Sequence, residues 1–304
     1  MRVLLTGASS FTGYWFARLL TEAGHQVVAP LRNTVAAYAE GVRGERVRRL
    51  AGFAEIVEDC AFGSPRFIDL ARRGFEVLCH HAAQVGDYRS PDFDIAAALA
   101  ANTLNLRAVL AEGAFKGVVL TGSVFENGEG AGNAPLVAFS PYGLSKALTA
   151  QVVEHRCREA GVGYGKFVIP NPFGPLEEPR FCAYLVRTWR AGEVAKVNTP
   201  AYIRDNIHVR LLALAYVRYA EEVAAGRAGA KLNPSGYVEA QGVFAERFAR
   251  EMRGRLGLAC GLDLARQTEF AEPVMRINTD PAALYVSGWD ERAAWDEVAE
   301  GYRA

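Results

Sequence analysis

Short apolar runs alternate with longer segments of helical periodicity through the first 170 residues of the chain. This pattern predicts buried strands joined by helices, which is typical of a parallel sheet with right-handed crossovers. The expected strands cover residues 2–6, 25–31, 54–59, 75–80, 117–122 and 164–169, and the expected helices cover 14–24, 65–73, 92–112 and 141–160. The predicted fold class is therefore α/β, with a Rossmann-like, doubly wound parallel sheet.

The regular alternation loosens after residue 170. Three prolines fall within residues 170–175 and stop any regular element there. Beyond them the pattern predicts helices near 180–191, 209–225 and 238–253, short strands near 194–197 and 230–233, and two short helical segments before the C-terminus. We expect the part outside the sheet to form a smaller cap.

The first expected strand runs directly into a glycine-containing turn and then into a helix. Gly7 and Gly13 bracket this turn, and Ser10 stands where a middle glycine is usual. Such a turn lets backbone N–H groups at a helix N-terminus approach a pyrophosphate, an anion that the helix dipole favours. The motif is weak alone, but its place on the first strand of an α/β sheet predicts a dinucleotide site.

The second expected strand ends at Arg32 without an acidic residue. An Asp or Glu at this point binds the ribose hydroxyls of NAD, whereas an arginine suits the extra phosphate of NADP. We therefore expect NADP, with NAD as the alternative if Arg32 is only a solvated loop residue. The basic segment 43–50 is interpreted as a solvated helix face.

Tyr142 and Lys146 stand one helical turn apart at the start of the expected helix 141–160. Their side chains share one helix face, and Pro141 suits the first helical position. An ammonium beside a phenol lowers the pKa of the phenol, so Tyr142 is predicted to exchange a proton with an alcohol or ketone. The alternative is that both residues lie on an ordinary surface helix; the strand before them and the glycine turn favour catalysis.

Composition excludes several classes of function. Acidic and basic residues balance at 34 each, so nothing suggests nucleic acid or a membrane surface as a partner. The five cysteines are scattered and never form a C-x-x-C pair, which argues against disulfides and zinc. The adjacent His80 and His81 lack acidic or cysteine company, so we expect a structural role and no metal. No signal peptide or membrane span is recognised, and a cytoplasmic protein is expected.

These motifs together resemble those of the extended short-chain dehydrogenases/reductases, the family of nucleotide-sugar epimerases, dehydratases and reductases. The resemblance covers nearly the whole chain, and it includes the His80–Ala83 strand end and Asn102, which tends to be structural in the family. It implies dinucleotide contacts from Gly7, Ser9, Ser10, Phe11, Gly13, Arg32, Asp59, Cys60, His80, Ala82, Ala83, Lys146 and Pro170.

The resemblance also implies the catalytic residues. Segment 121–125 is similar to the run that ends in Val-Tyr-Gly in the family, and counting back from Phe125 places the catalytic hydroxyl at Thr121, with Ser123 as the second choice. Thr121 would hydrogen-bond the reacting oxygen and Tyr142 would pass the proton. Lys146 would lower the pKa of Tyr142 and hold the nicotinamide ribose.

Substrate contacts are implied in the same way. Segment 170–175 resembles the loop whose asparagine touches the sugar nucleotide, and segment 204–209 resembles an Arg-Asp-x-x-His-Val run whose arginine holds a substrate phosphate. Bidentate geometry suits Arg204 to a phosphate, and an ion pair with a neighbouring residue is the alternative. The implied substrate-binding residues are Gln84, Asn171, Arg204 and Arg276.

Departures from the family pattern narrow the predicted reaction. Val168 replaces an arginine, Arg210 and Leu211 replace an acidic pair, and Gly122 and Ser123 stand where 4,6-dehydratases carry Asp and Glu. Elimination of water needs that acid and base, so a dehydratase is disfavoured. The predicted function is NAD(P)-dependent hydride transfer at carbon four of a nucleotide sugar by a 4-keto reductase. The alternative is a 4-epimerase with tightly bound NAD, and the minor alternative is a non-catalytic NADP-binding sensor.

The domain and subunit organisation follows from the same resemblance. We expect residues 1–170 and about 203–228 to form the dinucleotide-binding domain, and residues 171–202 and 229–304 to form the nucleotide-sugar-binding cap. The loop 126–140 is long and polar enough to cover a substrate. A homodimer through the helices 92–112 and 141–160 is expected, and burial of these helices within the monomer is the alternative.

Overall fold

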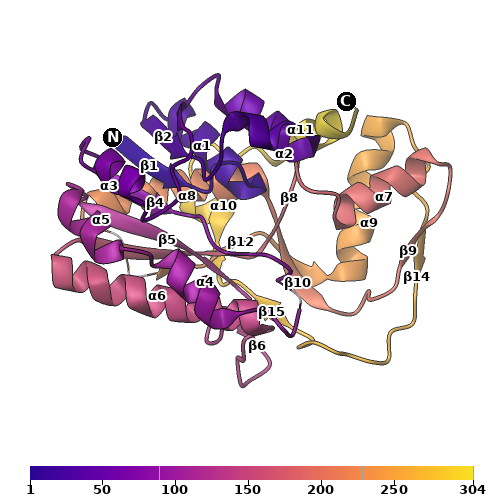
Figure 1. The fold of residues 1–304 in the computed structure, drawn as a ribbon. Helices are drawn as coiled ribbons and strands as arrows, with labels where there is room; N and C mark the ends of the chain where they lie inside the picture. The colour runs from indigo at the N-terminus through magenta and orange to yellow at the C-terminus, as the bar shows by residue number, and fades with distance from the viewer. Residues whose placement is uncertain (89, 228, 230, 304) are drawn as a thin grey trace.

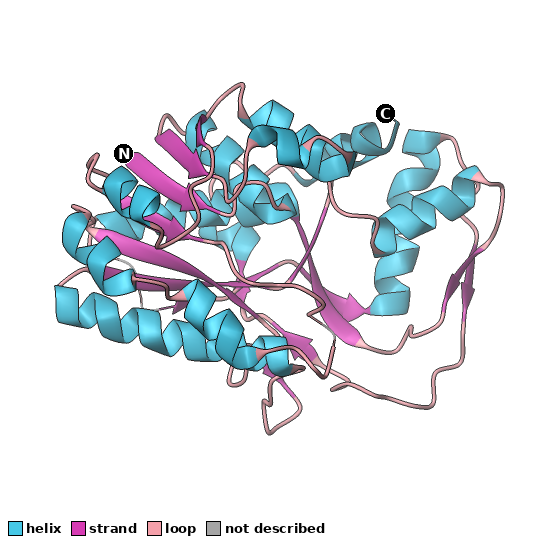
Figure 2. Ribbon diagram, in the orientation of Figure 1, coloured by secondary structure: helices cyan, strands magenta, loops and turns pink. Residues whose placement is uncertain are grey.

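Seven parallel strands form the central sheet, in the order β11-β7-β5-β4-β1-β2-β3. The computed structural model describes residues 1–88, 90–227, 229 and 231–303. Figure 1 shows the sheet with helices on both faces, and Figure 2 shows the same layers by element type. The predicted Rossmann-like, doubly wound class is confirmed. The strands are β1 (Arg2–Thr6), β2 (Gln26–Pro30), β3 (Glu55–Val57), β4 (Val77–His80), β5 (Gly117–Ser123), β7 (Gly163–Ile169) and β11 (Lys231–Leu232).

Each face of the sheet has its own hydrophobic core. On one face α1 and α8 pack together, and the Phe16 and Tyr216 rings stack with centroids 3.8 Å apart. On the other face Leu120 of β5 packs against Val153 of α6. The helices and the short 3₁₀ turn of this part are α1 (Phe11–Glu22), η1 (Val35–Tyr38), α2 (Gly41–Leu50), α3 (Pro65–Ala71), α4 (Ile95–Asn102), α5 (Leu106–Glu112), α6 (Pro141–Ala160) and α8 (Val209–Ala224).

A third core lies in the C-terminal part, where α7, α9 and α11 pack around Phe248 and Trp295. Figure 1 shows α7, α9, β9 and β14 as a lobe beside the sheet. Its elements are α7 (Phe181–Arg190), β9 (Ala195–Val197), α9 (Gln241–Leu256), β14 (Leu262–Leu264) and α11 (Glu291–Arg303). The remaining elements are β6 (Ala131–Gly132), β8 (Asn171–Phe173), β10 (Ile203–His208), β12 (Pro234–Ser235), β13 (Tyr237–Ala240), β15 (Arg276–Ile277), β16 (Asp280–Pro281) and α10 (Ala282–Tyr285). The predicted domain limits stay a prediction.

Two expected helices are wrong in their extent. The single helix expected over 92–112 is two helices, α4 and α5, because Asn105 takes a left-handed conformation with φ 48° and donates its side-chain amide to the Gly63 carbonyl (2.8 Å). The helix expected from residue 238 begins at Gln241, because residues 237–240 pair with β10 as an antiparallel strand.

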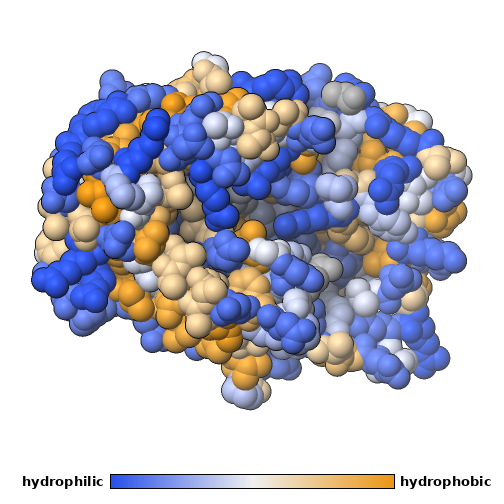
Figure 3. Space-filling view, viewed as in Figure 1, coloured by the Kyte–Doolittle hydropathy of each residue, from blue (hydrophilic) through white to orange (hydrophobic). Residues whose placement is uncertain are grey.

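The surface carries one apolar area of note. Figure 3 shows a largely hydrophilic face on which apolar side chains gather over α4 and α6. Leu104 and Leu144 lie in this part of the fold and are 45% and 38% exposed. No helix in the described part of the chain is long and apolar enough to span a membrane.

Candidate active site at the carboxyl ends of β1, β4 and β5

The turn between β1 and α1 has the geometry of a phosphate-binding loop. Gly7 lies at φ 75°, and a Cβ there would come within 2.8 Å of the Ala82 nitrogen. A Cβ on Gly13 would lie 2.2 Å from the Gly7 carbonyl oxygen. The Ser10 side chain caps α1 by accepting the Gly13 N–H (3.1 Å). Gly7 and Gly13 thus have no room for a side chain, and the N-terminus of α1 lies at the edge of the sheet. This arrangement fits a dinucleotide pyrophosphate.

A partly buried histidine joins this turn to β5. The His81 Nε2 atom lies 2.9 Å from Ser10 Oγ and 3.1 Å from Thr12 Oγ1. The other ring nitrogen, Nδ1, lies 3.0 Å from Thr121 Oγ1. Burial lowers the pKa of His81 to about 3, so the ring is neutral. His81 therefore occupies the space between the predicted cofactor loop and the predicted catalytic threonine.

The neighbouring His80 is hydrogen-bonded to β1 and to α4. Its Nδ1 lies 3.2 Å from Thr6 Oγ1, and its Nε2 lies 2.9 Å from the Asn102 carbonyl oxygen. The Asn102 side chain accepts the Gln84 N–H (2.8 Å) and donates to Thr149 of α6 (3.3 Å). These hydrogen bonds connect β1, β4, α4 and α6 next to the site.

Lys146 reaches the end of β5 from α6. Its Nζ donates to the Thr121 carbonyl oxygen at 2.5 Å, and the side chain is buried. The Tyr142 ring lies against Tyr88 and Phe93, with ring centroids 5.9 and 5.7 Å away. Thr121 is 3% exposed and turns its hydroxyl to His81, whereas the partly exposed Ser123 accepts the Phe125 N–H (3.2 Å).

The lowering of the Tyr142 pKa that was predicted from Lys146 does not occur in this arrangement. Burial raises the pKa of Tyr142 to about 12, and the Glu126 carboxylate acts in the same direction. Burial lowers the pKa of Lys146 to about 8, with Glu126 opposing the shift and Lys166 adding to it. The expected lowering of the phenol pKa is absent because the lysine ammonium is directed at the Thr121 carbonyl and both groups are desolvated.

A buried ionic cluster lies beside this pair. Lys166 of β7 binds Glu126 Oε2 at 2.5 Å and Glu129 Oε1 at 2.7 Å, and the Glu126 side chain is fully buried. Glu126 Oε1 also accepts the Ser123 N–H (2.7 Å), and a Cβ on Gly122 would lie 3.1 Å from this oxygen. Segment 126–140, predicted to cover a substrate, is therefore anchored at its start to the sheet.

Arg276 and Arg204 hold loops near the same region. Arg276 is 1% exposed and donates to the carbonyl oxygens of Val124, Glu126, Glu129 and Val137. Arg204 donates to the Ile203, Pro273 and Val274 carbonyls and pairs with Glu272 at 3.0 Å, as in the ion-pair alternative. The substrate roles predicted for both arginines, and for Asn171 in β8, stay predictions.

Basic residues of α2 contact the glycine turn. The sequence analysis did not predict these contacts. Arg43 donates to Ser9 Oγ (2.9 Å), and Arg46 donates to the Ser9 carbonyl (3.0 Å). Arg46 is fully buried and also binds the Leu176 carbonyl (2.7 Å) and Glu178 (2.6 Å). The interpretation of segment 43–50 as a solvated face is therefore wrong for Arg46, because its partners lie far away in the sequence.

The remaining predicted cofactor residues surround the same edge of the sheet. Arg32 donates to the Gln84 side chain (3.3 Å), which brings a predicted cofactor residue and a predicted substrate residue together. The Cys60 N–H binds the Leu31 carbonyl (2.7 Å), and Asp59 lies at φ 49°. Phe11 opens α1, the Ala82 N–H donates to Thr6, and Ala83 and Pro170 follow β4 and β7.

Comparison with known proteins identifies the family. The family model described as "NAD dependent epimerase/dehydratase family" matches residues 3–233. The chain belongs to this family. A search of curated proteins finds no match.

Solved structures of similar fold cover all of the chain at low identity. A UDP-glucose-4-epimerase from Stenotrophomonas maltophila, with NAD and formylated UDP-arabinopyranose, has a TM-score of 0.76 and 18% identity, over 100% of this chain and 97% of that one. A UDP-glucuronic acid 4-epimerase mutant from Bacillus cereus has a TM-score of 0.75 and 13% identity, over 100% of this chain and 99% of that one. A UDP-glucose 4-epimerase from Thermotoga maritima has a TM-score of 0.71 and 19% identity, over 100% of this chain and 99% of that one. These likenesses show that the epimerase/dehydratase family member has the fold of these enzymes.

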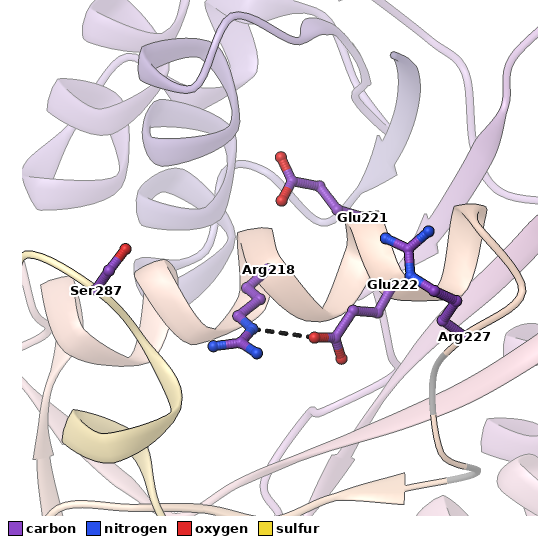
Figure 4. A pocket seen from close by; sticks show the side chains of 5 residues that line it. All are labelled: Arg218, Glu221, Glu222, Arg227 and Ser287. Atoms are coloured by element: carbon purple, nitrogen blue, oxygen red, sulfur yellow. Dashed lines mark hydrogen bonds and ion pairs between the residues drawn. The ribbon is translucent and has the colours of Figure 1, made fainter.

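An open pocket lies at the C-terminal end of α8, lined by Arg218, Glu221, Glu222, Arg227 and Ser287 (Figure 4). There Arg218 and Glu222 pair with each other at 3.0 Å, one helical turn apart. Among the described residues there is also no group of three or more metal ligands.

Proposed function

We propose that this protein catalyses reversible hydride transfer at one ring carbon of a nucleotide-linked sugar, with carbon four as the first candidate. The observation that carries the proposal is the meeting of the glycine turn, Thr121 and Lys146 at the carboxyl ends of β1, β4 and β5. Open α/β sheets bind their ligands at this edge. When bound, the nicotinamide dinucleotide accepts or donates the hydride.

Tyr142 is the proton donor and acceptor in this proposal, because its phenol stands one turn from Lys146 at the start of α6. Lys146 stabilises the developing phenolate and positions the ribose. Of the two predicted hydroxyls, Ser123 suits the reacting oxygen better than Thr121, since Ser123 Oγ accepts a backbone N–H while the Thr121 hydroxyl is bound to His81. Arg204 suits a substrate phosphate that replaces the half-exposed Glu272 carboxylate.

The 4-epimerase is the form of this reaction that the similar structures favour, since their names are those of UDP-sugar 4-epimerases. Such an enzyme removes the hydride, lets the keto sugar turn, and returns the hydride to the other face. The 4-keto reductase remains the second candidate on a separate observation. Arg43 contacts Ser9 of the glycine turn, and Arg32 follows the end of β2, where no acidic residue stands. Two arginines in these positions favour the 2′-phosphate of NADP.

Identification of the cofactor in the purified protein separates these candidates. The protein is denatured, and any released dinucleotide is identified by mass and quantified. Retained, stoichiometric NAD supports the epimerase. A protein purified without nucleotide that binds NADPH more tightly than NADH supports the reductase. A protein that binds neither dinucleotide overturns the proposal.

Replacement of Tyr142 tests catalysis itself. Tyr142→Phe removes the transferable proton and is expected to lower kcat by at least about a hundredfold, a typical contribution of general acid–base catalysis. The Kd for the dinucleotide should change little, because the ring remains in place. Unchanged turnover would refute this mechanism, and a variant that keeps its cellular effect without turnover would support the sensor.

The choice between the two hydroxyls has its own test. Ser123→Ala is expected to lower kcat by about tenfold to a hundredfold with a small effect on dinucleotide affinity. Thr121→Val keeps the volume of the side chain and should affect kcat less. The opposite ranking would return the catalytic role to Thr121.

The subunit state is a further part of the proposal. A homodimer through α4 and α6 is supported by the exposed Leu104 and Leu144 in this part of the surface. Leu144→Arg should convert the dimer to a monomer in sedimentation velocity. A wild-type protein that sediments as a monomer at high concentration would contradict it.

A further inference from the structure

A continuous line of hydrogen-bonding groups runs from the glycine turn to Lys146. The Ser10 hydroxyl lies 2.9 Å from the Gly7 carbonyl oxygen and 2.9 Å from His81 Nε2. His81 Nδ1 lies 3.0 Å from the Thr121 hydroxyl, and the Thr121 carbonyl receives Lys146 Nζ at 2.5 Å. The predicted pyrophosphate loop and the predicted catalytic lysine are thus joined through three side chains.

The direction of each bond follows from the hydrogens that are available. Gly7 offers only a carbonyl oxygen, so the Ser10 hydroxyl must donate to it. Ser10 Oγ, having given its one hydrogen away, can only accept from His81, which places a hydrogen on Nε2. A neutral imidazole then has no hydrogen on Nδ1, so the Thr121 hydroxyl must donate to it.

Neutrality of His81 is supported by its surroundings. The ring is enclosed by Phe16, whose centroid lies 5.2 Å away, and by the hydroxyls of Ser10, Thr12 and Thr121. The Lys146 ammonium and the His80 ring both lower the pKa of His81, because each repels a positive charge on its ring. No carboxylate contributes to stabilising an imidazolium there.

We propose that Ser10, His81 and Thr121 form a one-way hydrogen-bonded chain that positions Lys146 relative to the glycine turn, with His81 fixed as the Nε2–H tautomer. The chain rests on the proposed function for its ligand, a nicotinamide dinucleotide that contacts the turn at its pyrophosphate and Lys146 at its ribose. His81 is a positioning residue, since it acts through Ser10 and Thr121. The chain gives a reason for Ser10 in place of the usual middle glycine, because a glycine would leave His81 Nε2 with only Thr12.

The tautomer can be observed directly, without cofactor or substrate. Long-range ¹H–¹⁵N spectra of protein labelled in the histidine rings distinguish the Nε2–H form, the Nδ1–H form and the imidazolium. The chain has five histidines, so His81→Phe assigns the signal by its disappearance. We expect His81 to remain the neutral Nε2–H tautomer from pH 8 down to about pH 5, where a free histidine is charged. An Nδ1–H tautomer or an imidazolium at neutral pH would overturn the proposed direction of the chain.

A double-mutant cycle measures the coupling. His81→Phe and Ser10→Gly each break the chain and are each expected to weaken dinucleotide binding by about tenfold, the size of one buried hydrogen bond. The double variant should bind no worse than either single variant, because both changes break one link. The readout is titration of NAD and of NADP followed by tryptophan fluorescence.

Controls keep the outcomes distinct. Thr21→Val removes a hydroxyl from α1 that bonds only within the helix, to the Ala17 carbonyl (3.0 Å), and should leave the Kd unchanged. Effects of Ser10→Gly and His81→Phe that add fully, or a His81→Phe variant with wild-type affinity, would overturn the coupling while the proposed function stands. Loss of dinucleotide binding in the wild type would overturn both, and the tautomer would still be decided by NMR.

Discussion

Two polar assemblies flank the end of β5, one on each face of the sheet. On the face covered by α1 and α8, Thr121 belongs to the neutral chain with His81 and Ser10. On the opposite face, Gly122 abuts the ionic cluster in which Lys166 binds Glu126 and Glu129. Successive residues of one strand therefore contact assemblies of opposite character, as the alternation of a strand requires.

The difference shows two ways of arranging a buried site. The neutral chain fixes distances and directions without placing a net charge near the reacting groups. The ionic cluster acts through its field, since Glu126 raises the pKa of both Tyr142 and Lys146 and Lys166 lowers that of Lys146. Geometry and electrostatics at this site are thus supplied by separate residues, which can be perturbed one at a time.

The largest expected effect comes from breaking the ionic cluster. Lys166→Met leaves two buried carboxylates facing one another without their shared cation. We expect the free energy of unfolding to fall by about 3–5 kcal/mol at pH 7, measured by urea denaturation. The control is Lys231→Met, which removes the half-exposed partner of Glu129 and should cost less than about 1 kcal/mol. Equal losses in the two variants would show that burial of the cluster carries no special cost.

A second prediction concerns the neutral chain and acid. The folded pKa of His81 is about 3, below the unfolded value of about 6.5, so the unfolded chain binds the proton more readily. The contribution of neutral His81 to the free energy of unfolding is therefore complete above about pH 6.5 and is lost as the pH falls from there toward 3. Between pH 7 and pH 5 His81 should account for a loss of about 2 kcal/mol, and His81→Phe should show a dependence flatter by this amount.

Urea denaturation of both proteins at the two pH values measures the difference. His155→Gln serves as the control, since His155 is 61% exposed and its removal should leave the wild-type slope in place. Parallel pH dependences for wild type and His81→Phe would mean that His81 is charged or solvated in the folded protein.

The third and smallest effect is on the pH profile of catalysis. Glu126→Gln removes a charge that raises the pKa of Tyr142 and of Lys146, so both values should fall. The profile of kcat for alcohol oxidation should move to lower pH, and the rate on its acidic limb should rise by up to about tenfold per unit moved. The other groups that act on this pair are Tyr88, Arg180 and Lys166.

Glu129→Gln is the matched control for this experiment. Glu129 binds the same Lys166 but does not contribute to the pKa of Tyr142 or Lys146. Its profile should coincide with that of the wild type. A shift of the same size in both variants would assign the effect to Lys166 rather than to Glu126.

The sheet and the catalytic helix could be predicted because their signals are local. The strands are apolar runs, and α6 covers residues 141–160 as expected because Ser140 caps its start and Gly161 ends it at φ 67°. The break between α4 and α5 could not be predicted, since the left-handed Asn105 depends on the carbonyl of the distant Gly63.

The site residues likewise divide into those with a local sequence motif and those that depend on distant contacts. The glycine turn and the Tyr142–Lys146 pair carry local motifs, and the structure places both at the same sheet edge. The partners of His81, Glu126 and Arg46 are set by the tertiary fold. The sequence therefore indicated only a structural role for His81 and no specific role for Glu126 or Arg46. Lys166 did leave a signal, because a lysine within the apolar run 164–169 must find a partner when that strand is buried.

Arg46 also has a kinetic consequence. Its guanidinium fastens the Ser9 carbonyl of the glycine turn to the Leu176 carbonyl and to Glu178, just past β8 on the way into α7. We therefore expect the release of a dinucleotide bound at the turn to depend on a segment that leads into the C-terminal lobe. The residence time of the dinucleotide should then depend on both parts of the molecule, and mutation of Arg46 should shorten it.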